Sequence, residues 1–184
     1  MEHHKRSHRH LERSRVTRLV TAILTKDEAA EDRYLKRVLK RCKEFSDDIL
    51  LLDDGSTDDT AKIAEQFGCI VQETGGPGFW GASEAPARRK LWEVATKLAD
   101  GGWVLICDAD MILVGDPRPL CESWEMNAWA FPLADMWTEE VFRCDGFWQA
   151  HLHPRPWLFC PSRTPTNWNP VWPERALHCG HAPA

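Results

Sequence analysis

The sequence contains no apolar segment long enough to form the core of a signal peptide or to cross a membrane. We therefore expect no transmembrane segment and a cytoplasmic location. It also has no Asn-x-Ser/Thr sequon, and its seven cysteines include no CxxC pair, so a standard zinc module is not indicated. Because the number of cysteines is odd and several lie in apolar stretches, we expect reduced, buried thiols.

One common nucleotide-binding fingerprint is also missing, and another occurs at an unsuitable place in the chain. There is no P-loop pattern, and GxGxxG spacing occurs at Gly76, Gly78 and Gly81, after the third predicted strand. The proline and aromatic residues between these glycines suit a tight phosphate turn poorly. The first predicted strand, where such a fingerprint belongs, is followed by TKDEAAE without any glycine. A dinucleotide cofactor is therefore disfavoured, and we expect a mobile loop over a ligand site.

Charge is unevenly distributed along the chain. The 28 acidic and 23 basic residues give a net charge of −5, which argues against nonspecific nucleic-acid binding by the whole protein. Residues 2–18 nevertheless hold six Lys or Arg and four His, against two Glu. We expect residues 1–16 to form a basic, solvated tail; contact with an anionic surface is the alternative.

The length of 184 residues suggests one domain, and its first half alternates strand and helix patterns. Such alternation predicts an α/β fold with a mainly parallel sheet flanked by helices, in which ligands bind at the carboxyl ends of the strands. The expected strands span residues 18–24, 48–53, 69–73 and 103–110, and the expected helices span residues 32–43, 57–67 and 84–99.

The composition changes after Pro117. Seven of the ten tryptophans lie between Trp124 and Trp172, and prolines become frequent. We expect strands at 128–133 and 140–148, in antiparallel pairing, and mostly loop over 154–173. Most of these tryptophans are expected in the core, with a minority available to stack on sugars.

The segment LLDDGSTDDT, residues 51–60, ends a predicted buried strand with two adjacent carboxylates. The simplest interpretation is a strand-to-helix turn, with Ser56 or Thr57 as the helix cap and acidic residues in the first helical turn. That interpretation leaves Asp53 and Asp54 unexplained, because buried carboxylates are costly without partners.

A second acidic pair, Asp108 and Asp110 in CDADM, ends the fourth predicted strand. The ends of parallel strands share one edge, so the carboxylates of the two clusters would repel one another there. A divalent cation or the hydrogen-bond donors of a ligand would relieve that repulsion, and oxygen-rich sites suit Mg²⁺ or Mn²⁺. The alternative is two unrelated acidic turns.

The motifs AILTKDE, LLDDGSTDDT, APARR and CDADM, in this order, resemble those of a family 2 glycosyltransferase with the GT-A fold. The resemblance covers roughly residues 17–120. It implies a nucleotide-diphosphate sugar donor, with a UDP-sugar expected, a saccharide or other hydroxyl acceptor, Mn²⁺ or Mg²⁺, and inversion at the anomeric carbon. No specific nucleic-acid partner is implied.

The resemblance also assigns roles to individual residues. Arg88 would lie near the diphosphate, Asp108 would contact the ribose or sugar, and Asp110 would bind the metal, with Asp108 as a further candidate ligand. Arg89 departs from the family pattern, which has Asn there. The residues implied to line the nucleoside pocket are Thr25, Glu28, Asp53 and Asp54.

Residues 17–120 would thus form the nucleotide-sugar-binding half, and 121–184 an irregular, Trp- and Pro-rich acceptor region that completes the metal site in the same domain. Inverting transfer needs a base for the acceptor hydroxyl. We favour Asp145, which lies beside a glycine and aromatic residues, with Asp135, Glu139 and Glu140 as alternatives. For the metal, His178 is the preferred additional ligand and His181 the alternative.

Other hypotheses remain open from the sequence. One is a nucleotide-sugar-binding module without transferase activity. Another is a sugar nucleotidyltransferase, which should carry a glycine-rich basic loop after its first strand. A third is a zinc-stabilised C-terminal segment, whose ligands would come from His151, His153, Cys160, His178, Cys179 and His181.

Overall fold

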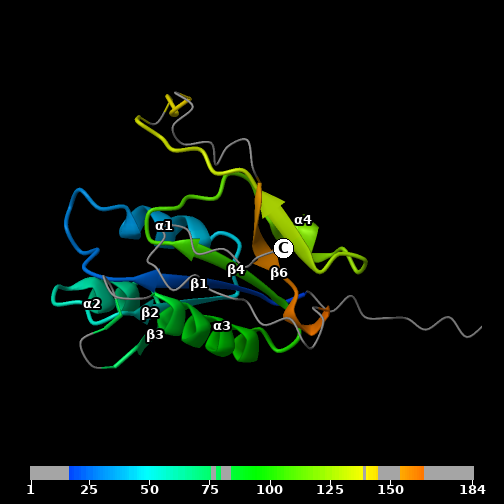
Figure 1. Cartoon of the computed structure of the whole chain (residues 1–184), viewed down its shortest axis with the longest axis horizontal. Helices are drawn as coiled ribbons and strands as arrows, with labels where there is room; N and C mark the ends of the chain where they lie inside the picture. The colour runs from blue at the N-terminus through cyan, green and yellow to red at the C-terminus, as the bar shows by residue number, and fades with distance from the viewer. Residues whose placement is uncertain (1–16, 76–77, 80–83, 139, 145–153, 164–184) are drawn as a thin grey trace, which may run out of the picture.

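The computed structural model describes residues 17–75, 78–79, 84–138, 140–144 and 154–163, and its centre is a six-stranded sheet (Figure 1). The strand order across the sheet is β3-β2-β1-β4-β6-β5. The first four strands are parallel to one another, whereas β6 runs antiparallel to both β4 and β5. The strands are β1 Leu19–Thr25, β2 Asp48–Asp53, β3 Ile70–Glu73, β4 Trp103–Asp108, β5 Ala128–Phe131 and β6 Arg155–Phe159.

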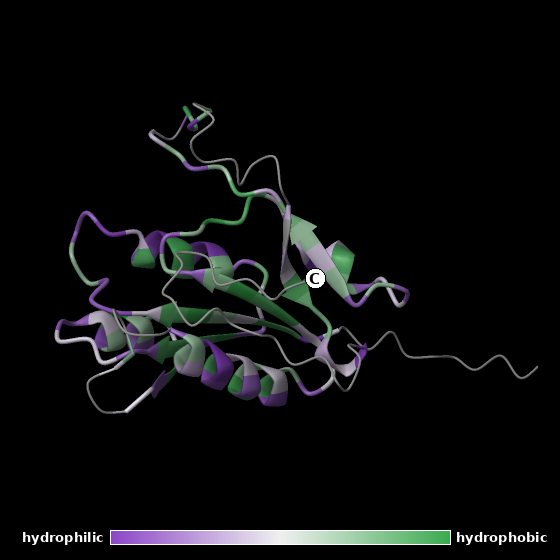
Figure 2. Ribbon diagram, in the orientation of Figure 1, coloured by the Kyte–Doolittle hydropathy of each residue, from purple (hydrophilic) through white to green (hydrophobic). Residues whose placement is uncertain are grey.

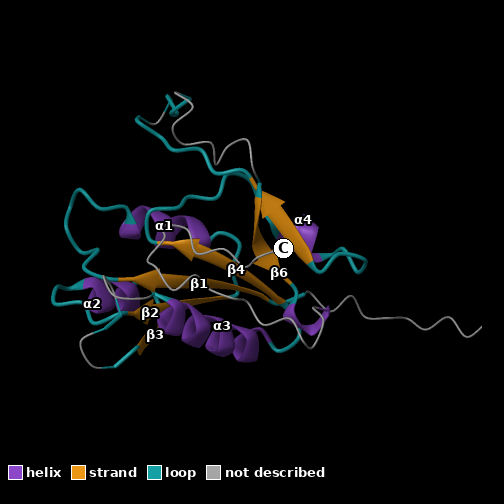
Figure 3. Ribbon diagram, in the orientation of Figure 1, coloured by secondary structure: helices purple, strands orange, loops and turns teal. Residues whose placement is uncertain are grey.

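Helices cover the two faces of the sheet (Figure 3). They are α1 Leu35–Cys42, α2 Thr60–Gln66, α3 Ala85–Ala99 and the short α4 Arg118–Cys121, followed by a 3-10 turn at Pro161–Arg163. One core cluster joins α1 and α2 to the sheet, and a second joins α3 to the opposite face. Within the part of the chain that the structure describes, no helix is long and apolar enough to cross a membrane.

The side chains of β1 contribute to both cores. Leu19 and Ile23 point toward α1, whereas Val20, Ala22 and Leu24 point toward α3, because successive side chains of a strand point to opposite faces of the sheet. All five are nearly inaccessible to solvent. In Figure 2 the central strands are mostly green, whereas α1 and α3 carry alternating purple and green bands. The predicted α/β class with a mainly parallel sheet is therefore confirmed.

The boundaries differ from the sequence prediction in two places. The helix expected from residue 57 begins at Thr60. Ser56 and Asp58 accept N–H groups of the loop after β1, and Asp58 also accepts the N–H of Thr60 at the helix start. The loop predicted over 154–173 contains β6, so the prediction was wrong there. Pro156 is tolerated in β6 because it lies opposite Ala130, beside a register shift in β5.

The second half was only partly predicted. The strand expected at 128–133 is β5. Residues 140–144 of the expected strand 140–148 form only an isolated bridge, between Met136 and Phe142, and the rest of that stretch lies outside the described residues. The six cysteines that the structure describes form no disulfide with one another, and four of them are buried, as expected.

Two arginines join the segment after β4 to the end of α1. Arg41 donates from Nε to the carbonyl of Leu113 at 3.0 Å. Arg118 donates to the carbonyl of Phe45 at 2.6 Å and to the carboxylate of Asp47 at 2.8 Å. Residues 113–118, which follow the acidic motif, are therefore fixed by contacts with residues about seventy positions earlier.

Val104 and Val114 form a matched test of the core. Val104 on β4 is fully buried, whereas Val114 is 94% exposed. We predict that Val104→Ala lowers the free energy of unfolding by about 2–3 kcal/mol, because buried carbons and their contacts are lost. Val114→Ala should change it by less than about 0.5 kcal/mol. Urea unfolding measures both, and equal losses would contradict the assigned core.

Candidate functional site at the carboxyl edge of the sheet

The predicted convergence of strand ends is present in the structure. Thr25 at the end of β1 is aligned with Asp53 at the end of β2, and Leu24 is aligned with Asp108 at the end of β4. The two acidic motifs therefore flank the central strand on one edge. Alternation places Asp53 on the α1 face and Asp108 on the α3 face.

Asp53 is almost fully buried beside a threonine hydroxyl. Its carboxylate accepts hydrogen bonds from the backbone N–H and the hydroxyl of Ser56. Thr25 Oγ1, on the neighbouring strand, is also buried and has no hydrogen-bond partner within the described residues. A buried hydroxyl without a partner is uncommon in proteins, so this one is suited to a group supplied by a ligand.

Asp54 has a different position from the one expected. It is fully buried and accepts hydrogen bonds from Thr74 Oγ1 and from the backbone N–H of Phe79, both at 2.8 Å. At Gly78, with φ of +77°, a Cβ would lie 2.0 Å from the carbonyl oxygen of Asp54, so only glycine fits. Asp54 therefore anchors the glycine-containing loop after β3 and does not face the open edge.

The loop after β1 is attached to the turn after β2 by four side chains. The loop residue Asp27, at φ of +52°, accepts from the N–H of Thr57 at 2.7 Å, and its own N–H donates to Ser56 Oγ at 2.9 Å. The next N–H, of Glu28, donates to Thr60 Oγ1 at 2.7 Å. Asp58 accepts the N–H of Ala29 in the same way. The hydroxyl and acidic residues of the motif thus fix the backbone that carries Glu28.

Arg88 is buried between two carboxylates. It donates from Nη1 to Asp108 at 2.6 Å and from Nη2 to Glu84 at 3.0 Å, and Nε also donates to Glu84. Burial opposes its charge, but the carboxylates of Asp108 and Glu84 outweigh burial and raise the pKa of Arg88. Arg88 lies in the first turns of α3, as predicted, yet its guanidinium holds Asp108 instead of facing the open edge.

Glu84 is a site residue that the sequence analysis did not identify. Its spacing of four residues before Arg88 at the start of a helix is the signal that was available. The pair fixes the orientation of the guanidinium, which in turn orients Asp108. In the part of the chain that the structure describes, the second carboxylate oxygen of Asp108 has no hydrogen bond, so it remains available to a ligand.

We predict that Arg88→Met lowers the free energy of unfolding by about 3–5 kcal/mol, because it leaves two poorly solvated carboxylates without a counter-ion. Arg89→Met, at the exposed neighbouring position, should cost less than about 0.5 kcal/mol. The double variant Arg88→Met, Glu84→Gln should recover part of the loss. Equal urea midpoints for the Arg88 and Arg89 variants would contradict the buried ion pairs.

Glu28 and Asp110 are electrostatically coupled at the open edge. The pKa of Glu28 is raised, first by burial and then by the carboxylates of Asp110 and Asp58, while Arg33, with a nitrogen 3.7 Å from a Glu28 oxygen, opposes the shift. Asp110 itself is exposed. A positive charge between the two carboxylates would therefore be favourable.

We predict that Glu28→Gln is more stable than the parent protein near about pH 7 and that the difference disappears near about pH 4. The folded protein holds the Glu28 proton more tightly than the unfolded chain, so the stability contributed by protonated Glu28 is lost as pH rises through the raised pKa. Urea unfolding at both pH values measures the effect. Glu31→Gln, in the same loop, is the control, and an equal pH dependence in both variants would contradict the assignment.

The donor set at this edge fits a divalent cation that also binds a substrate. Among the described residues, no group of three or more His, Cys, Asp and Glu side chains is placed so that it could hold a metal ion. A cation at this edge would therefore need further ligands from a substrate. The carboxylates of Asp108 and Asp110 are oxygen ligands of the kind that Mg²⁺ and Mn²⁺ take, and such ions commonly bind one or two carboxylates together with substrate phosphates. The site fits that arrangement.

The remaining predicted residues are placed as follows. Asp135 forms an ion pair of 3.8 Å with Arg143, and Glu140 is exposed. Of the zinc hypothesis, only Cys160 is described; it is buried and lies beside a serine hydroxyl. The residues of these predictions that lie outside the described part of the chain are Glu139, Asp145, His151, His153, His178, Cys179 and His181.

Residues 22–116 match glycosyl transferase family 2, and the chain belongs to that family. Over 88 residues it is 34% identical to an uncharacterized glycosyltransferase of Rickettsia felis. That match covers 48% of this chain and 27% of the relative, so the chain spans about a quarter of the length of this curated relative.

Solved structures show similarity in fold. A 4-diphosphocytidyl-2C-methyl-D-erythritol synthase matches 79% of this chain and 76% of its own, with 16% identity and a TM-score of 0.52. Glucosyl-3-phosphoglycerate synthase from Mycobacterium tuberculosis, in complex with Mn²⁺, UDP and glucosyl-3-phosphoglycerate, matches 61% of this chain and 42% of its own. The identity there is 19% and the TM-score is 0.43.

Proposed function

We propose that this protein transfers a sugar from a nucleoside diphosphate donor, expected to be a UDP-sugar, to an acceptor hydroxyl, with inversion at the anomeric carbon and with Mn²⁺ or Mg²⁺. The observation that carries the proposal is the placement of Asp108. Arg88 fixes this aspartate at the end of β4, one oxygen remains available, and Asp110 follows two residues later on the exposed side. Membership of glycosyl transferase family 2 supports the same reaction class.

In this proposal the two sides of the edge bind different parts of the donor. The buried Thr25 hydroxyl and the Asp53 carboxylate hold hydrogen-bonding groups of the nucleoside, and Glu28 borders the same pocket. Asp108 contacts the ribose or the sugar. Asp108 and Asp110 would hold the divalent cation, which when bound supplies positive charge to the diphosphate of the leaving group.

The acceptor hydroxyl must lose a proton as its oxygen attacks the sugar carbon. A carboxylate within hydrogen-bond reach is suited to accept it. Asp145 remains our proposed base, and His178 our proposed additional metal ligand. Among the alternatives, Asp135 is less suited because it already pairs with Arg143.

A sugar nucleotidyltransferase is the second hypothesis, because the synthase fold matched above covers most of both chains. Such an enzyme needs a cradle for triphosphate directly after its first strand. Here the loop after β1 has no glycine, and its backbone N–H groups are bound to Ser56, Thr60 and Asp58. Products separate the hypotheses, since transfer releases a nucleoside diphosphate and nucleotidyl transfer releases pyrophosphate.

We predict that Asp110→Asn loses the thermal stabilisation that UDP-sugars give in the presence of Mn²⁺, because a ligand stabilises the folded state only as far as it binds. Release of UDP should fall on the order of 100-fold. Asp116→Asn is the matched control, since this exposed aspartate lies in the same segment and Asn can still accept the N–H of Arg118.

Three outcomes are informative. Loss in the Asp110 variant alone supports the proposal. A variant with normal Mn²⁺-dependent stabilisation and turnover contradicts the metal assignment. Stabilisation of the parent protein by UDP-sugars without any release of UDP, across a panel of hydroxyl acceptors, would support a binding module in place of an enzyme.

A further inference from the structure

Three charged side chains, here called the acidic triad, connect the start of α3 to the end of β4. Arg88 donates from Nε and Nη2 to one carboxylate oxygen of Glu84, at 3.2 and 3.0 Å, and from Nη1 to Asp108 at 2.6 Å. The side chain of Arg88 is 4% exposed, that of Glu84 8% and that of Asp108 18%. Asp108 is therefore the member of the triad that solvent reaches most.

The acidic triad holds more negative than positive charge. Its two carboxylates and single guanidinium leave one negative charge in excess. One carboxylate would be enough to neutralise Arg88, so the second is not needed for that purpose. A net charge with so little solvent is costly unless another group compensates it.

The excess charge is accessible at Asp108. Because Arg88 binds both carboxylates, its positive charge is shared between them and neither carboxylate is fully neutralised. Arg88 binds one oxygen of Asp108, and the other oxygen accepts no hydrogen bond from the residues that the structure describes. Asp108 is the last residue of β4, at the carboxyl edge of the sheet.

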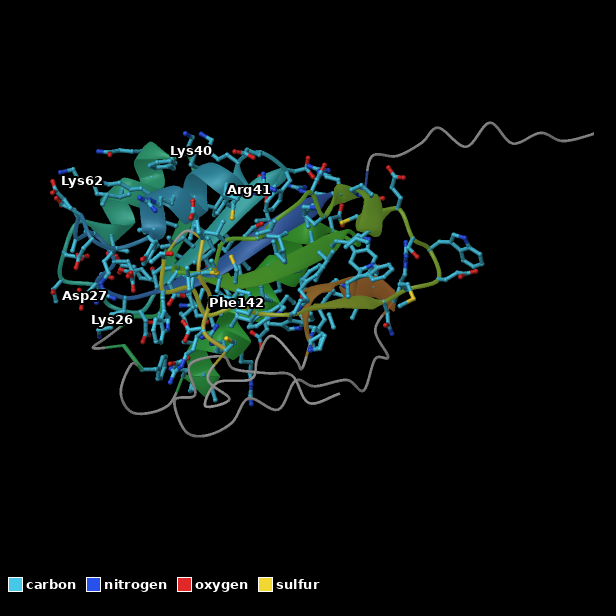
Figure 4. The ribbon with its side chains drawn as sticks, turned by 90° about the horizontal axis from the view of Figure 1, so that it is seen from above. Lys26, Asp27, Lys40, Arg41, Lys62 and Phe142 are labelled. Atoms are coloured by element: carbon cyan, nitrogen blue, oxygen red, sulfur yellow. The ribbon has the colours of Figure 1, made fainter. Side chains whose placement is uncertain are left out.

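The described part of the protein supplies no second cation for this charge. In Figure 4 the labelled Lys40 and Lys62 lie on the side of α1 and α2, and Lys26 lies by the loop after β1. Among the described residues, the ion pair with Arg88 is the only one that Asp108 forms. The compensating positive charge can therefore come from a ligand.

We propose that Glu84 is a positioning residue that strengthens the binding of a divalent cation at Asp108 by taking part of the charge of Arg88. With Glu84 ionised, Arg88 orients Asp108 but neutralises it incompletely, so Asp108 keeps negative charge for the cation. Without the charge of Glu84, Arg88 and Asp108 would form a neutral pair, which attracts Mn²⁺ or Mg²⁺ more weakly. The inference rests on the proposed metal site but does not require the transfer reaction.

A purely structural role of Glu84 is the competing explanation. Such a role needs an acceptor for Nε and Nη2 of Arg88, and a single oxygen of Glu84 accepts both bonds. The neutral amide oxygen of a glutamine can accept them as well. Removing the charge while keeping the acceptor therefore separates the two roles.

The test is titration of the full chain with Mn²⁺, with and without UDP, measured by the electron paramagnetic resonance of unbound Mn²⁺. Glu84→Gln should bind Mn²⁺ about tenfold more weakly than the parent protein, as is typical when a residue that supports a metal ligand is changed. Glu93→Gln removes the same charge from an exposed position of α3 and should bind like the parent protein. Circular dichroism of each variant shows that the fold is retained.

A second variant separates charge from reach. Glu84→Asp keeps the carboxylate but shortens the side chain by one methylene, so its affinity for Mn²⁺ should exceed that of Glu84→Gln. In turnover of a UDP-sugar, Glu84→Gln should need about tenfold more Mn²⁺ for half-maximal release of UDP but should approach the parental rate at saturation. A displaced Asp108 would instead lower the rate at saturation.

Two results would overturn the inference alone. Equal affinity of Glu84→Gln and the parent protein for Mn²⁺ would assign Glu84 to the fold. Equal weakening in Glu84→Asp and Glu84→Gln, with a lower rate at saturation, would assign it to the orientation of Asp108 without an effect of charge.

Failure of the proposed function has a different result. A parent protein that binds no Mn²⁺, with or without UDP, would contradict the metal site and this inference together. Weaker binding of Mn²⁺ by Glu84→Gln, in a protein that releases no UDP, would support the inference and contradict only the transfer reaction.

Discussion

The candidate site depends on one buried cation. Arg88 connects the first turn of α3 to the last residue of β4, through Glu84 on one side and Asp108 on the other. Without Arg88, the poorly solvated carboxylates of Glu84 and Asp108 would have no counter-ion. The guanidinium binds both of them and so fixes the orientation of Asp108. The acidic motif after β4 therefore begins from a defined position, which a flexible loop could not supply.

The other side of the edge is fixed in a different way. Between the loop after β1 and the turn after β2, side-chain oxygens of Ser56, Asp58 and Thr60 take the backbone N–H groups that a free loop would offer to water. Asp54 does the same for the loop after β3, through Phe79. Most polar side chains of the segment LLDDGSTDDT thus hold the backbone of the neighbouring loops in place. Of its acidic residues, Asp53 lies beside the hydroxyl that has no partner among the described residues.

Sequence periodicity was sufficient to predict the parallel sheet and the meeting of the strand ends, because burial dictates both patterns. It could not reveal that Asp54 is bound by Thr74 and Phe79, or that Arg88 holds Asp108, since these partners come from other segments of the chain. The start of the second helix was displaced to Thr60 because polar side chains before it found partners across the fold. β6 was missed because Pro156 normally indicates a loop, and the bulge that admits it belongs to another strand.

The position of β1 in the middle of the sheet has a consequence for synthesis on the ribosome. β2 follows at residue 48 and β3 at residue 70, whereas β4, which covers the other side of β1, begins only at residue 103. Until then the hydrogen-bonding edge of an apolar strand has no partner in the emerging chain, and such edges pair readily with foreign strands. Slow decoding between residues 75 and 103 would therefore lengthen the exposure of that edge, and we expect codon choice in this interval to influence the yield of folded protein.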